Sequence, residues 1–230
     1  MKIGIMGGQR DVASNGRASA SKNFSVARRD LKIGIMGGTF DPIHLGHLAT
    51  AEAVREIFSL DEILFIPAAR PPHKLGKNIT DEQHRLAMTI LATRSNKFFR
   101  VSDMEFKRTG LSYTLDTMNE LHKNFGASTE LFFIIGADSL ADLSKWHAAK
   151  ELVDKCHFIA TTRQGVDADF SAVEKFFGAA AREHIHPVTT PGLEISSTDI
   201  REKIRLGRSI KYLVPEAVEE YILRERLYDS

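Results

Sequence analysis

From Leu31 onward, short runs of apolar residues alternate along the chain with longer stretches in which apolar residues recur every three or four positions. The short runs are typical of buried strands, and the longer stretches are typical of amphipathic helices. Strands that alternate with helices favour a parallel sheet covered by helices on both faces. The pattern therefore predicts one α/β domain with a Rossmann-like, doubly wound parallel sheet, followed by helices at its C-terminal end.

Six apolar runs are the predicted strands, at residues 32–36, 62–66, 99–104, 131–135, 157–161 and 185–188. The predicted helices between them cover residues 46–58, 82–93, 114–125, 140–146, 148–154 and 169–177. Two more helices follow, over residues 198–206 and after Pro215, where the missing N–H of proline breaks no helical hydrogen bond. Ligands of doubly wound sheets bind beyond the carboxyl ends of the strands, so we expect the functional site in the loops that follow the strands.

The sequence KIGIMGG occurs twice, at residues 2–8 and 32–38, but only the second copy continues into a motif. The stretch between the copies is rich in Ser, Ala and Arg and poor in large apolar residues. Such a segment buries too little apolar surface to offset the entropy lost on ordering. We therefore expect residues 1–30 to be a mobile or loosely docked extension, residues 31–230 to form the folded domain, and the second copy to form its first strand. The composition of the extension also fits an organellar transit peptide.

Charge and composition narrow the classes of function. Lys and Arg number 31 and Asp and Glu 30, so a formal net charge of +1 gives no broad positive field to hold nucleic acid or an anionic membrane. The single cysteine, Cys156, excludes an internal disulfide and a cysteine-rich zinc site. No apolar run approaches the length of a membrane span. We expect a soluble, cytoplasmic protein that recognises phosphate locally and binds neither nucleic acid nor membrane, and association into a homo-oligomer stays open.

The loop after the first predicted strand reads GGTFDPIHLGH, at residues 37–47, and it leads into a helix. Its first two glycines let the backbone approach a ligand closely, and the N-terminus of the helix offers unpaired N–H groups to an anion. His44 and His47 lie three residues apart with Gly46 between them, so both imidazoles can face one phosphate. A metal site is the alternative, but no third ligand stands nearby at metal spacing. The loop therefore predicts a site for a triphosphate.

A second anion site is predicted near the C-terminus, in the segment ISSTDIR at residues 195–201. Ser196 or Ser197 can cap a helix that begins at Thr198. The hydroxyls, the N–H groups of the first turn and the guanidinium of Arg201 would then converge on one anion. Plain helix capping is the alternative, because Ser-Ser-Thr before a helix is common.

Both motifs resemble those of a known superfamily. GGTFDPIHLGH is similar to the HxGH signature of the nucleotidylyltransferases, and ISSTDIR is similar to their C-terminal motif. Four further segments resemble those of nicotinate mononucleotide adenylyltransferases: PPHK at residues 71–74, SYTLDT at 112–117, GADSL at 136–140 followed by Trp146, and TTRQG at 161–165. The motifs stand in the order of that family, and the resemblance covers the chain from Leu31 to Ser230.

The resemblance implies a role for each of these segments. Catalysis would depend on His44, His47 and Arg201. ATP would be bound by Gly37, Gly38, Thr39, Phe40, Gly46, Asp138, Ser197 and Thr198. The mononucleotide would be bound by His73, Lys74 and Arg163 at its 5′-phosphate, by the backbone N–H of Thr114 or Leu115 at the nicotinate carboxylate, and by Trp146 stacked on the ring. Without the resemblance, Asp138 is an acidic residue at a strand end where a ribose can bind, and Trp146 also fits core packing.

The reaction implied is adenylyl transfer from ATP to nicotinate mononucleotide, which yields nicotinate adenine dinucleotide (deamido-NAD) and pyrophosphate in NAD biosynthesis. The mononucleotide phosphate would attack the α-phosphorus directly, with Mg²⁺ held through the ATP phosphates and no covalent enzyme intermediate. Nicotinamide mononucleotide or phosphopantetheine as the acceptor is the alternative within the superfamily. A non-catalytic nucleotide-binding module is the alternative from another class, and the intact His44, His47 and Arg201 argue against it.

Overall fold

Six strands pair in one parallel sheet in the part of the chain that the structure, a computed structural model, describes: residues 31–74, 76, 78–162 and 170–229. Their order is β3-β2-β1-β4-β5-β6, with β1 at Lys32–Gly38, β2 at Glu62–Pro67, β3 at Phe99–Val101, β4 at Glu130–Gly136, β5 at His157–Thr162 and β6 at Ile185–Thr189. The strand β1 pairs with β2 on one side and with β4 on the other, so the strand order reverses at β1. This confirms the predicted Rossmann-like, doubly wound sheet, whose ligands bind beyond the carboxyl end of the strand at the reversal.

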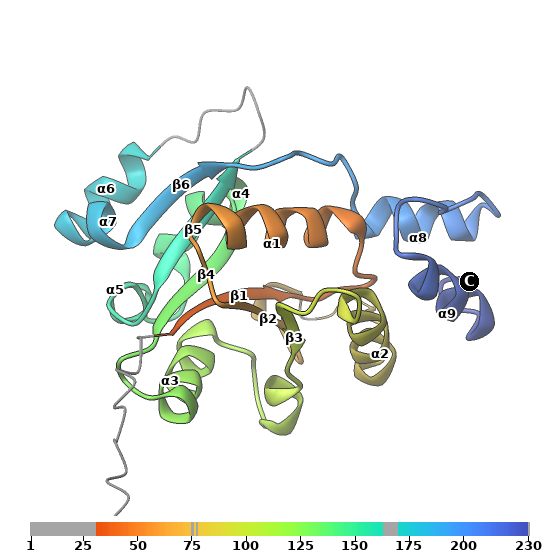
Figure 1. The fold of residues 1–230 in the computed structure, drawn as a ribbon, viewed down its shortest axis with the longest axis horizontal. Coiled ribbons are helices and arrows are strands. Elements are labelled where there is room, and N and C mark those ends of the chain that lie inside the picture. Colours follow the sequence, from red (N-terminus) through yellow and green to blue (C-terminus); the bar gives the residue numbers. More distant parts are fainter. Residues whose placement is uncertain (1–30, 75, 77, 163–169, 230) are drawn as a thin grey trace, which may run out of the picture.

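Helices cover both faces of the sheet, with α1 and α3 on opposite sides in Figure 1. One face is packed by α1 (Leu45–Ile57), α2 (Glu82–Thr93), α8 (Ser197–Arg205) and α9 (Glu216–Arg224). The other face is packed by α3 (Thr114–Phe125), α4 (Ala137–Ala141), α5 (Ala149–Val153), α6 (Ser171–Phe177) and α7 (Ala179–His184). Short 3-10 helices, η1 (Pro72–Lys74), η2 (Met104–Lys107) and η3 (Leu143–Lys145), lie in the connections.

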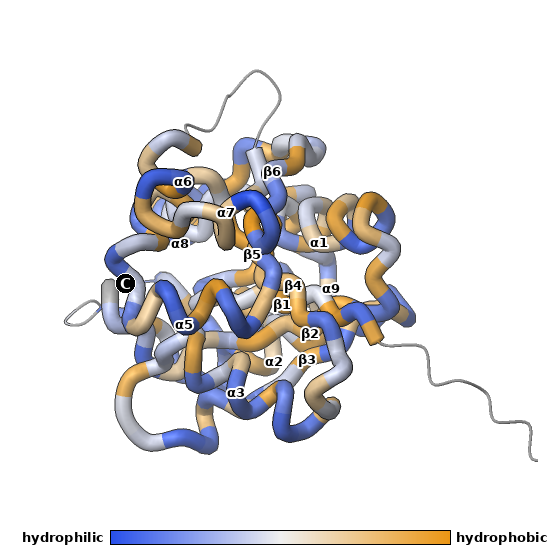
Figure 2. Tube along the Cα trace, turned by 90° about the vertical axis from the view of Figure 1, so that its left-hand side faces the viewer, coloured by the Kyte–Doolittle hydropathy of each residue, from blue (hydrophilic) through white to orange (hydrophobic). Residues whose placement is uncertain are grey.

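Alternate residues of the central strands fill two hydrophobic cores. In β4, Leu131 and Phe133 pack into the core under α3, whereas Phe132 and Ile134 pack into the core under α1. Successive side chains point to opposite faces, so a strand covered on both faces is an almost continuous apolar run. Figure 2 shows β1, β2 and β4 in orange, whereas the amphipathic α5 alternates between blue and orange. Each fully buried large apolar side chain contributes about 1.5–3 kcal/mol, and the two cores together fix the carboxyl ends of β1 and β4.

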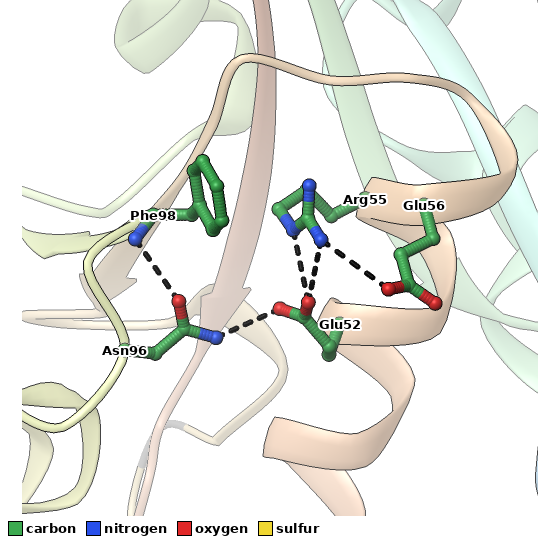
Figure 3. A network of polar contacts seen from close by, with 5 residues as sticks. All are labelled: Glu52, Arg55, Glu56, Asn96 and Phe98. Carbon is green, nitrogen blue, oxygen red and sulfur yellow. Dashed lines mark hydrogen bonds and ion pairs between the residues drawn. The ribbon is translucent and has the colours of Figure 1, made fainter.

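A polar network fastens α1 to the connection between α2 and β3 (Figure 3). One oxygen of Glu52 accepts a hydrogen bond of 2.6 Å from Arg55 Nη2, and the other accepts one of 2.7 Å from Asn96 Nδ2. Asn96 Oδ1 in turn accepts the backbone N–H of Phe98 at 3.0 Å, and the Arg55 guanidinium lies 4.2 Å from the centre of the Phe98 ring. The network therefore helps to hold in place the helix whose N-terminus faces the candidate site.

Two predicted elements differ from the structure by more than two residues at one end, and one observed helix was not predicted. The predicted strand at 99–104 is too long, because the hydroxyl of Ser102 accepts the N–H of Met104 at 3.3 Å and the chain turns into η2. The predicted helix at 140–146 is wrong in its bounds: α4 begins at Ala137, and the chain breaks at Asp142 before η3. The helix α7 has no predicted counterpart, because six residues are too few to reveal a helical repeat.

The second KIGIMGG copy forms β1, as predicted from the motif that follows it. Residues 1–30, with the first copy, lie outside the described residues, so the boundary between extension and domain stays a prediction. Among the helices of the described ranges, none combines the length and the apolar character needed to cross a bilayer.

Candidate active site

The GGTFDPIHLGH loop starts at the carboxyl end of β1 and leads to His44, the N-cap of α1. Two of its glycines stand where a side chain would collide: a Cβ at Gly38 would lie 2.9 Å from Phe40 Cε1, and a Cβ at Gly46 would lie 3.0 Å from His44 Nδ1. Phe40 has a left-handed φ of 49°, and its buried ring packs against Phe65 of β2. The loop is therefore anchored in the core right up to the helix N-terminus.

The two histidines of this loop stack on each other. Their ring centres are 3.7 Å apart and the ring planes are inclined by 29°. His47 Nδ1 accepts the backbone N–H of His44 at 3.2 Å, so a neutral His47 carries its proton on Nε2. The buried Nδ1 of His44 has no hydrogen-bond partner among the described residues. The pair can thus offer N–H donors to a ligand in front of the helix.

Burial keeps both imidazoles neutral at pH 7. It lowers the pKa of His44, whose exposed fraction is 6 %, to about 4. Burial, with smaller contributions from the neighbouring charges of His44 and Lys74, also lowers the pKa of His47 well below its ordinary value. The contribution of Lys74 places the PPHK loop within electrostatic reach of the histidines. Neutral donors beside one lysine form a site that attracts anions without strong repulsion between its own groups.

The ISSTDIR motif folds against the histidine loop although more than 150 residues separate them. Ser196 caps α8, because its Oγ accepts the N–H of Asp199 at 3.0 Å. Ser197 Oγ donates to the carbonyl of Pro42 at 2.9 Å. Arg201 donates from Nη1 to the Asp41 carbonyl at 2.6 Å and from Nη2 to Thr198 Oγ1 at 3.3 Å. The structure therefore joins the two predicted anion sites into one, although α8 begins one residue earlier than predicted.

Arg85, a buried residue that was not predicted from the sequence, holds the loop after β1 in place. Arg85 of α2 is only 2 % exposed and donates from Nη1 to the carbonyls of Thr39 and Ala68, at 2.9 and 2.7 Å, and from Nε to the Thr80 carbonyl at 2.9 Å. These bonds tie the loop after β1 to the loop after β2. The available signal was its position on the apolar face of the helix, three residues before Met88, where a charged residue needs buried partners.

The segment SYTLDT lies beside the loop that follows β2. Ser112 donates its N–H to the Arg70 carbonyl at 3.0 Å, and its Oγ accepts the N–H of Arg70 at 3.1 Å. The helix α3 begins at Thr114 after an N-cap at Tyr113. The N–H groups of a first helical turn have no partner within the helix, so those of Thr114 and Leu115 are suited to an anion.

Asp138 and Trp146 follow β4, the strand next to β1. Asp138 is exposed in the first turn of α4. Trp146 is half-buried and sets its edge against Phe133 and Phe158, with ring centres 6.0 and 6.3 Å apart. The next residue, His147, lies with its ring centre 4.3 Å from that of Tyr113, which brings the Trp146 turn to the start of α3. Trp146 is thus both a packing residue and a neighbour of the proposed carboxylate site.

Not every predicted site residue can be placed. Gly37 and Gly38 are the last two residues of β1. The backbone of His73 lies in η1, and its side chain is outside the described part of the structure. Arg163 lies outside the described residues altogether. Within the described part of the chain, no group of three or more His, Cys, Asp and Glu side chains is arranged to hold a metal ion.

Known proteins that are similar to this chain belong to the same superfamily that its motifs resemble. The cytidylyltransferase-like family model matches residues 35–203. A protein from Thermoanaerobacter sp. (strain X514), named as a probable nicotinate-nucleotide adenylyltransferase, is 51 % identical over 205 residues, covering 87 % of this chain and 95 % of the relative. One of the same name from Moorella thermoacetica is 46 % identical over 206 residues, covering 89 % and 95 %.

Solved structures agree with the sequence relatives. The Plasmodium falciparum nicotinic acid mononucleotide adenylyltransferase in complex with NaAD has a TM-score of 0.69 and 26 % identity, covering 86 % of this chain and 98 % of that one. A putatively named nicotinate-nucleotide adenylyltransferase from Vibrio parahaemolyticus has a TM-score of 0.59 at 21 % identity, and it supports the fold alone. From the family model and these relatives together, the chain belongs to the nicotinate-nucleotide adenylyltransferases of the cytidylyltransferase-like family.

Proposed function

We propose that this chain transfers the adenylyl group of ATP to nicotinate mononucleotide at the carboxyl end of β1, with release of pyrophosphate and formation of nicotinate adenine dinucleotide for NAD biosynthesis. Family membership supports the overall reaction. The observation that supports its location is the junction of the two motifs, where Arg201 donates to the Asp41 carbonyl three residues before the stacked histidines begin. A site made of imidazole, guanidinium and hydroxyl donors is suited to a triphosphate.

The reaction needs little covalent chemistry from the protein. An oxygen of the mononucleotide phosphate attacks the α-phosphorus, and the bond from that phosphorus to the β-bridging oxygen breaks as its electron pair leaves with pyrophosphate. We assign to His44 and His47 the stabilisation of the charge that develops on the phosphates. We assign the binding of the departing β and γ phosphates to Arg201, to the Thr198 hydroxyl and to the backbone N–H of Ser197 at the start of α8. Donors that are already in place stabilise such charge without reorganisation during the reaction.

The remaining ATP contacts follow from the same loop. Gly37, Gly38 and Gly46 leave room for the nucleotide close to the backbone, and Thr39 and Phe40 line the turn between them. The exposed carboxylate of Asp138, at the end of the adjacent strand β4, is suited to a ribose hydroxyl.

We propose that Mg²⁺ enters with ATP and is held by phosphate oxygens and water. The protein groups around the proposed triphosphate site are neutral or cationic donors, and the Asp41 carboxylate already accepts hydrogen bonds from Tyr228 and Thr80. Magnesium prefers oxygen ligands and keeps several waters, so this donor set fits a metal carried by the substrate. Bound there, the ion would neutralise charge on the phosphates.

On the acceptor side, we propose that the first-turn N–H groups of Thr114 and Leu115 bind the nicotinate carboxylate and that Trp146 stacks on the ring. A helix N-terminus favours a carboxylate over a neutral amide, because its dipole and free N–H groups both attract an anion. His73, Lys74 and Arg163 are assigned to the mononucleotide phosphate, and the electrostatic influence of Lys74 on His47 supports the first part of this assignment. We place the reaction in the cytoplasm, which the single buried thiol of Cys156 supports.

Pyrophosphate release with ATP and Mg²⁺ tests the proposal. We expect release with nicotinate mononucleotide, release slower by about tenfold or more with nicotinamide mononucleotide, and none with phosphopantetheine. His47→Ala should abolish most of the activity, whereas His122→Ala, on α3 next to the Lys155 carbonyl, should not. Release only with another acceptor would refute the substrate assignment. No release with any acceptor, together with retained ATP binding, would instead favour the non-catalytic nucleotide-binding module.

A further inference from the structure

The chain turns back on itself after α9 and brings Tyr228 to the histidine loop. Arg226 and Tyr228 have left-handed φ values of 52° and 69°, which residues other than glycine rarely adopt. The N–H of Leu227 donates to the Ile222 carbonyl at 3.0 Å, and the side chains of Leu227 and Tyr228 pack against the core under α1. A backbone this constrained needs specific contacts to hold it, and the main polar one is made by Tyr228.

The hydroxyl of Tyr228 donates to Asp41 Oδ1 at 2.7 Å. The second oxygen of the same carboxylate accepts the N–H of Thr80 at 3.3 Å, and Asp41 is only 5 % exposed. Burial and the adjacent Asp41 carboxylate raise the pKa of Tyr228, so its hydroxyl stays protonated and acts as the donor. If the hydroxyl is removed, one oxygen of a buried carboxylate loses its partner, which is unfavourable enough to make the carboxylate move.

A shift of the Asp41 main chain that follows its carboxylate reaches the proposed triphosphate site directly. Its own carbonyl accepts the hydrogen bond of Arg201, and the carbonyl of the next residue, Pro42, accepts that of Ser197. Two residues further on, His44 caps α1. The Asp41–Pro42 turn therefore connects the three groups to which we assign phosphate binding, and Tyr228 holds that turn from the far end of the chain.

We propose that Tyr228 is a positioning residue for the triphosphate site, and that the C-terminal turn acts as a latch which sets Arg201 and the histidine loop for ATP. The proposal rests on the proposed function. It differs from simple anchoring of the C-terminus, because an anchor affects unfolding alone, whereas a latch on Asp41 affects ATP binding and turnover but not the binding of the acceptor.

The chain offers a matched control in Tyr221 of α9. Its hydroxyl makes a hydrogen bond of 2.9 Å with His84 Nδ1 of α2, and within the described part of the chain neither side chain is hydrogen-bonded to a proposed site residue. Tyr228→Phe and Tyr221→Phe each remove one hydroxyl that ties the C-terminal segment to the body of the protein. We expect Tyr228→Phe to lower kcat/KM for ATP about tenfold and to leave KM for nicotinate mononucleotide unchanged. Tyr221→Phe should leave both kcat/KM for ATP and KM for nicotinate mononucleotide within about twofold of the wild-type values.

Thermal unfolding and direct ATP binding, measured by calorimetry, complete the test. The proposal is overturned if Tyr228→Phe lowers the Tm as Tyr221→Phe does but leaves ATP affinity and kcat at wild-type values, or if KM for the acceptor changes as much as KM for ATP. If the wild-type protein releases no pyrophosphate with any acceptor, the proposed function fails, yet the Kd for ATP of the two variants still decides whether Tyr228 sets the triphosphate site.

Discussion

The two sides of the candidate site are built in different ways. The side assigned to the triphosphate rests on buried groups, since Asp41, His44 and Arg85 are each almost inaccessible to solvent. The side assigned to the mononucleotide is formed by η1, the start of α3 and the turn after η3, where Lys74, Thr114 and Trp146 are only half-buried. Short surface elements with few buried contacts open more easily than core segments. The difference suggests a rigid ATP half beside a more adaptable acceptor half.

This division matches the chemistry assigned to each half. Charge develops at the phosphates during transfer, and donors fixed in advance stabilise it best. Three separate elements fix them here: Arg85 from α2, Ser197 and Arg201 from α8, and Tyr228 from the C-terminal turn. The acceptor has only to be bound and oriented, so a surface formed from helix ends and one aromatic ring is sufficient.

The largest loss of activity is expected from a substitution in the ATP half. Arg201→Ala removes a cationic donor and also frees the Asp41 carbonyl to which it is bonded at 2.6 Å. We expect kcat/KM for ATP to fall about 10²–10³-fold, equivalent to about 2.7–4 kcal/mol of transition-state stabilisation. Steady-state pyrophosphate release measures it.

The matched control is Arg205→Ala, one turn further along α8, where the exposed guanidinium pairs with Glu202. That change should leave kcat/KM within about twofold, because exposed ion pairs contribute little. Equal losses in the two variants would show that positive charge on α8, rather than the contact with the turn, supports activity.

A smaller effect is expected on the pH dependence of the free energy of unfolding, through His44 of the ATP half. The folded-state pKa of His44 is about 4, below the ordinary value of 6.5, so the unfolded chain binds more protons between these values. Because His44 must stay neutral in the fold, the free energy of unfolding is highest above about pH 6.5 and decreases as the pH falls toward 4. At pH 5 the loss is about 2 kcal/mol.

His44→Asn should remove this loss while keeping a residue that caps helices well. Urea unfolding at pH 7 and pH 5 gives the measurement, and the wild-type change in unfolding free energy should exceed that of the variant. Burial also lowers the pKa of His47, His157 and His186, so a remaining pH dependence is expected in the variant. Identical pH dependence in both proteins would contradict the assignment of a buried, neutral His44.

The two motifs of the ATP half could be predicted from the sequence, whereas the residues that hold these motifs in place could not. The two motifs were found because their residues are contiguous, and α2 and α3 were predicted with their observed bounds because an acidic N-cap or a long amphipathic repeat marks them. Arg85 and Tyr228 were missed, since each acts through partners distant in the chain: Arg85 Nη1 bonds the Thr39 carbonyl across 46 residues, and Tyr228 bonds Asp41 across 187. No local pattern encodes such pairs. The break at Asp142 was also missed, because α4 and η3 together have the length and composition of one helix.

The smallest effect is expected from a substitution in the acceptor half, at Trp146. Trp146→Phe keeps an aromatic ring against Phe133 and Phe158 but offers a smaller face for stacking. We expect KM for nicotinate mononucleotide to rise about tenfold, equivalent to about 1.4 kcal/mol, with KM for ATP and the Tm nearly unchanged. An equal rise in both KM values would mean that the two halves move together. A change confined to the acceptor would show that the ATP half keeps its geometry while the acceptor half varies, which is the independence that its separate, buried supports predict.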